Sequence, residues 1–144
     1  MIDEVFSGQL LLAVILRSKT SFEQGIKFVT PDEFSQQLGY MRRPEGYKIP
    51  PHVHNPVSRN VLYTKEVLLI KSGSVRVDFY TDQQIYLESR IISTGDIILL
   101  AHGGHGFEML EDTQIIEIKQ GPYAGDKDKT RFTGISSVEA VIKS

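Results

Sequence analysis

The sequence predicts an all-β protein, either a sandwich or a barrel, with the jelly roll among its natural closed forms. Three observations favour this class. The apolar stretches are short, residues 75–80 alternate apolar and polar side chains as a half-exposed strand does, and turns rich in Gly, Pro, Asp and Ser separate the stretches. The chain has no repeat of fixed period, no heptad pattern and no low-complexity linker.

The N-terminal residues are expected to form two strands and one short helix. Residues 9–16 are rich in branched aliphatic side chains and few in number, which favours a buried strand, and residues 25–29 resemble a second strand. Residues 30–33, Thr-Pro-Asp-Glu, have the pattern of a helix start, with a Thr N-cap, Pro at the first helical position and a carboxylate at the third. Gly39 would end this helix.

From residue 40 onward the pattern predicts strands alone. They are expected at 47–54, 66–71, 75–80, 85–92, 97–101, 107–110 and 114–119. The double proline at 50 and 51 assigns the first of them to a sheet edge, and the last is expected to be central. Residues 130–144 would add one more strand or a short helix.

A chain of 144 residues fits a single domain, 1–144, with a core barrel over about 40–120. Residues 1–39 would supply the N-terminal strands and helix, and residues 121–144 a C-terminal extension. The net charge is −2, the isoelectric point is near 6.1, and the 16 Lys and Arg are scattered, so we expect no nucleic-acid partner.

The longest apolar run has seven residues, 10–16, and follows acidic side chains, so we expect neither a membrane span nor a signal peptide and predict a cytoplasmic protein. The chain has no cysteine, which excludes disulfides, thiolate metal sites and thiol nucleophiles. Any metal must therefore use imidazole and carboxylate ligands, which suit Fe, Mn, Ni, Co or Zn.

Two of the four histidines, His52 and His54, are separated by one residue. In an extended strand, side chains two positions apart point to the same face, so both imidazoles could bind one metal ion. Glu66 follows twelve residues after His54 and opens the apolar run 67–70. A carboxylate at the start of a buried strand needs a partner, and a cation held by the two imidazoles would provide one.

These residues resemble the first motif of the cupin superfamily, small β-barrels of the double-stranded β-helix type. That motif is Gly, five residues, His-x-His, three or four residues, Glu, six residues, Gly. This chain has Gly46, five residues, His52-Val53-His54, eleven residues, Glu66, six residues and Gly73. Both ends of the motif match, and the middle is longer.

The second cupin motif is Gly, five residues, Pro-x-Gly, two residues, His, three residues, Asn. Gly95 begins the corresponding segment, Ala101 replaces the proline, and His105 arrives one residue early. Met109 or Leu110 stands where the asparagine would be. Together the two motifs cover residues 46–110.

The resemblance implies one divalent transition metal (Fe, Mn, Ni, Co or Zn) held by His52, His54, Glu66 and His105. His102 competes with His105 for the third imidazole position, and we favour His105, with His102 as an outer or entrance residue. Lys48 shares strand parity with the first two histidines, and Arg59 lies in the eleven-residue insertion. Either could hold an anionic group of a substrate, and either could instead be a solvated surface residue.

The resemblance further implies a small-molecule substrate or ligand. We expect a metal-dependent enzyme of the dioxygenase or isomerase type that acts on a small polar or anionic molecule. One alternative is a metal-free cupin similar to nucleotide-sugar isomerases and epimerases, with a cavity histidine as general base. Another is a non-catalytic protein that binds a small ligand. A homodimer is expected, because the apolar strand at 10–16 would be hazardous as a free edge.

Overall fold

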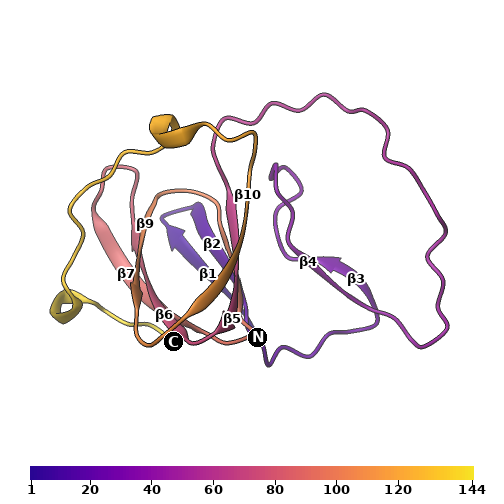
Figure 1. The fold of residues 1–144 in the computed structure, drawn as a ribbon, viewed down its shortest axis with the longest axis horizontal. Helices are drawn as coiled ribbons and strands as arrows, with labels where there is room; N and C mark the ends of the chain where they lie inside the picture. The colour runs from indigo at the N-terminus through magenta and orange to yellow at the C-terminus, as the bar shows by residue number, and fades with distance from the viewer. The chain divides into compact units, whose positions relative to one another are not determined.

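Ten β-strands make up nearly all the regular structure of the computed structural model, which describes residues 1–144 (Figure 1). The chain divides into two compact units: residues 1–20 with 63–144 form the first, and residues 21–62 form the second. The strands form three antiparallel sheets and no closed barrel. The all-β class is therefore confirmed, whereas the double-stranded β-helix stays a prediction.

The first unit contains a five-stranded and a three-stranded sheet. The five-stranded sheet has the order β1 (Ile2–Ser7), β2 (Leu10–Leu16), β8 (Ile97–Leu100), β5 (Glu66–Ser72) and β10 (Gln114–Lys119). The three-stranded sheet has the order β7 (Tyr86–Ser93), β6 (Ser74–Tyr80) and β9 (Gly104–Met109). Two short 3-10 helices follow at Gly125–Asp128 and Ser137–Glu139. In the second unit, β3 (Gly25–Phe28) pairs with β4 (Gly39–Arg42).

One hydrophobic core joins the two sheets of the first unit, an arrangement consistent with a β-sandwich. Alternate residues of β6, namely Val75, Val77 and Phe79, pack in it with Leu68 and Ile70 of β5. Each is an apolar side chain almost fully removed from water, and burial of each contributes roughly 1.5–3 kcal/mol. The period of two in these strands therefore fixes which side chains face inward.

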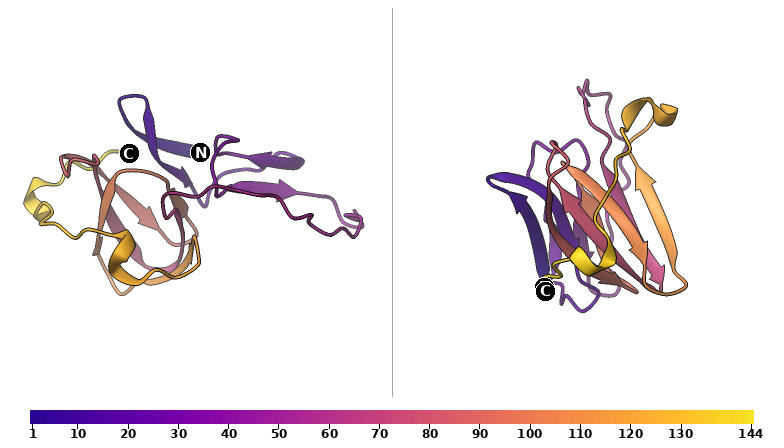
Figure 2. Two further views of the ribbon diagram at one scale, coloured as in Figure 1. Left: turned by 90° about the horizontal axis from the view of Figure 1, so that it is seen from above. Right: turned by 90° about the vertical axis from the view of Figure 1, so that its left-hand side faces the viewer.

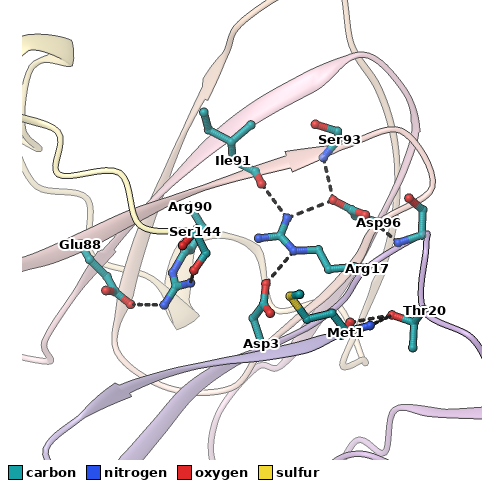
Figure 3. Close-up of polar contacts among 11 residues, drawn as sticks. Met1, Asp3, Arg17, Thr20, Glu88, Arg90, Ile91, Ser93, Asp96 and Ser144 are labelled. Atoms are coloured by element: carbon teal, nitrogen blue, oxygen red, sulfur yellow. Dashed lines mark hydrogen bonds and ion pairs between the residues drawn. The ribbon is translucent and has the colours of Figure 1, made fainter.

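Arg17, at the end of β2, ties the two sheets together through an ion-pair network (Figure 3). Its guanidinium donates to Asp3 (2.6 Å), to Asp96 (3.1 Å) and to the carbonyl oxygen of Ile91 (2.7 Å). The Asp96 carboxylate also accepts the backbone N–H groups of Ser18 and Ser93. Burial raises the pKa of Asp96, but these hydrogen bonds and the Arg17 charge outweigh it and hold that pKa below its usual value.

The C-terminal tail covers the outer face of the three-stranded sheet, as the right-hand view of Figure 2 shows. The backbone N–H of Ile135 donates to the Tyr80 hydroxyl, and Ser137 donates to Glu108. Residues 141–143 then hydrogen-bond to Ser89 at the edge of β7. The tail therefore contains a short 3-10 helix, one of the two predicted alternatives, and an isolated bridge to Ser89 in place of a strand.

This cover corrects the prediction that strand 75–80 is half-exposed. Arg76 and Asp78 lie on the outer face, yet each is only 5% exposed. They pair through two hydrogen bonds of 2.8 and 2.9 Å, and Arg76 also pairs with Glu108 at 2.6 Å. Alternation with polar residues indicated a solvated face, whereas the tail and these ion pairs make it a buried one.

The helix predicted after residue 30 is absent, and this expectation was wrong. The segment forms turns in which the Gln37 amide donates to the carbonyl oxygens of Pro31 and Phe34. The Thr30 hydroxyl donates to Gln37 and accepts the N–H of Leu38. Side chains thus satisfy backbone groups that a helix would use, and so short a helix would be marginal in any case.

The strand predicted at 47–54 is also absent, since residues 43–65 contain no strand. Pro50 and Pro51 lack N–H donors and fix their φ angles, which opposes a ladder of sheet hydrogen bonds. His52 and His54 therefore lie on an irregular segment of the second unit.

The strand order corrects two further expectations. β2 lies between β1 and β8, so the apolar run 10–16 is no free edge, and that argument for a homodimer falls. β10 was expected to be central and is instead an edge strand. The sequence analysis missed β1, whose residues are mostly polar or half-exposed.

No helix of the structure has the length and hydropathy that crossing a bilayer requires.

Asp96→Ala is expected to lower the free energy of unfolding at neutral pH by about 3 kcal/mol, because it removes one of the two carboxylates paired with Arg17 and leaves two backbone N–H groups without their acceptor. Urea unfolding followed by circular dichroism measures this. Asp126→Ala is the control, because it breaks an exposed pair with Arg131 and should cost at most about 1 kcal/mol. Equal losses in the two variants would contradict the role of the network.

Candidate functional site

Glu66 and His105 lie in contact on the first unit, although 38 residues separate them in the chain. The Nε2 atom of His105 is 3.2 Å from an Oε atom of Glu66. The register of β9 pairs His105 with Phe79, and Leu68 follows two residues after Glu66. Both neighbours belong to the core, so the two site residues lie on the inner faces of their sheets.

The entry to β9 depends on Gly103. Its φ is +70°, and a Cβ atom at this position would collide with the carbonyl oxygen of Tyr80. Only glycine adopts this conformation without strain. Strand β9 begins at the next residue, Gly104, and His105 is its second residue. Strand β9 thus begins three residues earlier than predicted, within the glycine-rich segment.

Lys119 is a third member of the site, and sequence analysis did not identify it. It is the last residue of β10 and pairs with Glu66 in the β5–β10 register. Its Nζ atom lies 3.4 Å from the second Glu66 carboxylate oxygen and 3.7 Å from Glu117. Ile115 packs against the core, and the period of two gives Lys119 the same face, a pattern that could have indicated it.

The charges of this cluster favour an ionised Glu66. The hydrogen bond from His105 lowers the pKa of Glu66 to about 2, against the opposing effect of burial and with the help of the Lys119 charge. Burial would lower the pKa of Lys119, but its hydrogen bond and attraction to Glu66 raise that pKa instead. The site is therefore a carboxylate held between an imidazole and an ammonium group.

His52 and His54 belong to the second unit, where both are exposed. Their ring centroids are 5.3 Å apart with an interplanar angle of 73°. The Nδ1 atom of His52 lies 3.0 Å from the carbonyl oxygen of Pro50. A hydrogen bond to this carbonyl would leave Nε2 as the free ring nitrogen, the arrangement usual for a metal-binding histidine.

The remaining candidates make other contacts or belong to the second unit. His102 packs edge-on against Tyr63 with centroids 6.1 Å apart, and burial together with the Lys65 charge lowers its pKa. Lys48 and Arg59 are exposed in the second unit, where Arg59 donates to the carbonyl oxygen of Val57 at 3.4 Å. Their expected role in substrate binding stays a prediction.

The donor types suit a divalent transition metal. Glu66 and His105 are a carboxylate and an imidazole within 3.2 Å of each other, and one ion can bind both. Within either unit, no group of three or more His, Asp or Glu side chains is gathered as a complete metal site. The four predicted ligands are therefore divided, two on each unit.

Comparison with known proteins identifies no relative: no family model, no curated protein and no solved structure matches the chain.

The free energy of unfolding should depend on pH through the ionisation of Glu66. Because its pKa falls from 4.5 to about 2 on folding, its ionised form adds stability that is complete above pH 4.5 and is lost as pH falls towards 2. In urea unfolding of EDTA-treated protein between pH 6 and pH 2, Glu66→Gln should lose less stability than wild type. Glu111→Gln, at an exposed turn, should follow wild type. Parallel curves for wild type and Glu66→Gln would contradict this.

Proposed function

We propose that the chain is a metal-binding protein of the cupin type, with one divalent transition metal held by Glu66, His105, His52 and His54. The contact between Glu66 and His105 is the observation that carries this proposal. The two residues come from separate motifs, and the resemblance assigns both to one ion.

The properties of these residues support the ligand roles. Glu66 is ionised at neutral pH, so it needs to lose no proton when it binds a cation. The Pro50 carbonyl can fix the ring of His52 and leave its Nε2 as the ligand atom. A bound metal would supply Lewis-acid or redox chemistry to a small substrate.

We further propose that the protein is an enzyme acting on a small polar or anionic molecule. Three imidazoles and one carboxylate fill four positions of an octahedral ion and leave two for substrate oxygens or dioxygen. His105 and Lys119 are partly exposed, at 28% and 31% of their side chains, so solvent reaches the cluster. Turnover of a substrate would separate this role from that of a protein that only binds its ligand.

Metal binding provides the direct test. Wild type should take up about one Mn²⁺, Co²⁺ or Zn²⁺ per chain in equilibrium dialysis followed by elemental analysis. Glu66→Gln, His105→Ala and His52→Ala should each weaken binding by at least about tenfold, because each removes a direct ligand. Glu111→Gln should bind as wild type does, and circular dichroism would verify that each variant is folded. Wild-type protein that binds none of these metals would contradict the proposal.

The same contact favours a second candidate, a metal-free enzyme in which His105 is a general base. A carboxylate 3.2 Å from an imidazole can orient it and stabilise its protonated form. Lys119 adds a positive charge that could hold a phosphate or carboxylate of the substrate. This is the arrangement that an isomerase or epimerase of nucleotide-sugars would need.

Calorimetry on EDTA-treated protein tests the second candidate. A panel of nucleoside-diphosphate sugars should give saturable binding if it is correct, and His105→Ala should retain binding while abolishing turnover. Glu66→Gln should shift the pH profile of the rate, because it removes the group that holds the imidazole. Absence of binding across the panel would remove this candidate and leave the metal-dependent one.

A further inference from the structure

We propose that the free edge of β10 is an association surface and that its partner is the β10 strand of a second copy of this chain. The two strands pair antiparallel about Ile118 and join two five-stranded sheets into one. The inference goes beyond the proposed function and requires no metal ion. It uses a different strand from residues 10–16, on which the sequence-based expectation of a homodimer rested.

β10 lies at one end of its sheet, where β5 is its sole neighbour, so half of its backbone groups lack a strand to pair with. Gln120, the residue after β10, donates its backbone N–H to the carbonyl oxygen of Lys65. Hydrogen-bonding directions alternate along an antiparallel strand, so Ile118 also directs its backbone groups to β5. Glu117 and Lys119 then direct theirs to the free edge, which is a template for another strand.

The other three edge strands of the first unit are each protected from such pairing. β1 has two acidic residues, Asp3 and Glu4, and a register shift further along the strand. On the edge of β7, Ser89 forms backbone hydrogen bonds with residues 141–143 of the tail. β9 has two glycines among its six residues, which weaken it as a strand.

The side chains of β10 make its edge attractive to another strand. On the outer face, Ile116 and Ile118 are 47% and 57% exposed. The strand, Gln-Ile-Ile-Glu-Ile-Lys, has three isoleucines, no net charge and neither Pro nor Gly. Segments of this composition have a high propensity to pair as strands. β10 therefore lacks the protection that the other edges have.

The charges of β10 favour a second copy of the same strand as the partner. Inward-facing charges usually oppose edge pairing, because the partner strand leaves them uncompensated. When Ile118 lies opposite its own copy, however, Glu117 of each strand lies opposite Lys119 of the other, and opposite charges meet twice. Glu117 can accept this contact, because its side chain is 46% exposed and its own Lys119 neighbour is 3.7 Å away.

The same charges select one register. A shift that places Glu117 opposite its own copy brings like charges together, which destabilises a strand pair. A further shift places Ile116 opposite its own copy and each Glu117 against the apolar Ile115, where the carboxylate gains no partner. Pairing about Ile118 is therefore the register that compensates the inner face.

Single cysteines test the partner and the register together, because the chain has no cysteine of its own. Opposed residues of a non-hydrogen-bonded pair have Cα atoms about 4.5 Å apart, within the range of roughly 4.4–6.8 Å that a disulfide spans. Ile118→Cys should therefore form a disulfide-linked dimer under mild oxidation. The two copies of position 116 lie roughly 13 Å apart along the strands, so Ile116→Cys should not cross-link. Ile85→Cys, at an exposed isoleucine outside β10, is the matched control and should not cross-link either.

Sedimentation equilibrium measures the association without a cross-link. Wild type should form a dimer, and Ile118→Lys should weaken it by at least about tenfold, because two ammonium groups then lie opposite each other. Ile85→Lys adds the same charge at a side chain that is 62% exposed and should associate as wild type does. Circular dichroism would verify that each variant is folded.

Three results would overturn the inference. The first is wild-type protein that sediments only as a monomer throughout the micromolar range. The second is a dimer that Ile118→Lys leaves intact, because another surface would then join the two copies. The third is cross-linking of Ile116→Cys alone, or cross-linking only in a mixture of Ile116→Cys and Ile118→Cys, since each result corresponds to a register other than the one about Ile118.

Discussion

The arrangement of the site depends on the need to compensate the charge of the Glu66 carboxylate. It begins β5 on the inner face, where the next inward side chains of that strand, Leu68 and Ile70, belong to the core. An ionised carboxylate in such a place is costly unless other groups compensate it. His105 of β9 and Lys119 of β10 provide that compensation. The cluster therefore forms only when both sheets are assembled, because β9 belongs to one sheet and β10 to the other.

Local patterns sufficed for most strands. Residues 10–16, 66–72, 74–80, 86–93, 97–100 and 114–119 were predicted to within two residues, because short apolar runs bounded by turns have one natural conformation. The errors arose where side-chain contacts outside the apolar pattern decide the conformation. The tail buries Arg76 and Asp78, which no local alternation could indicate, and Gln37 satisfies carbonyl groups that a helix would otherwise use.

The candidate site was predictable in part for the same reason. The resemblance to the two cupin motifs is what paired Glu66 with His105 in expectation, and their contact in the structure agrees with that pairing. Lys119 lies outside both motifs, and its contact with Glu66 depends on the register between β5 and β10. The strand predicted at 47–54 was an error of another kind. Pro50 and Pro51 remove N–H donors that a strand needs, and the prediction gave them too little weight.

The two charged clusters of the first unit have different physical characters, and that difference bears on function. Arg76, Asp78 and Ser89 are almost fully buried, and Asp78 accepts hydrogen bonds from the other two, so this cluster has its partners without a ligand. Glu66, His105 and Lys119 are only partly buried, and the side chain of Lys119 also lines a pocket. A structural ion-pair network gains most when water is excluded and its partners are complete. The second cluster instead keeps donor atoms accessible on the inner face of a sheet, as the ligand binding that we propose for it requires.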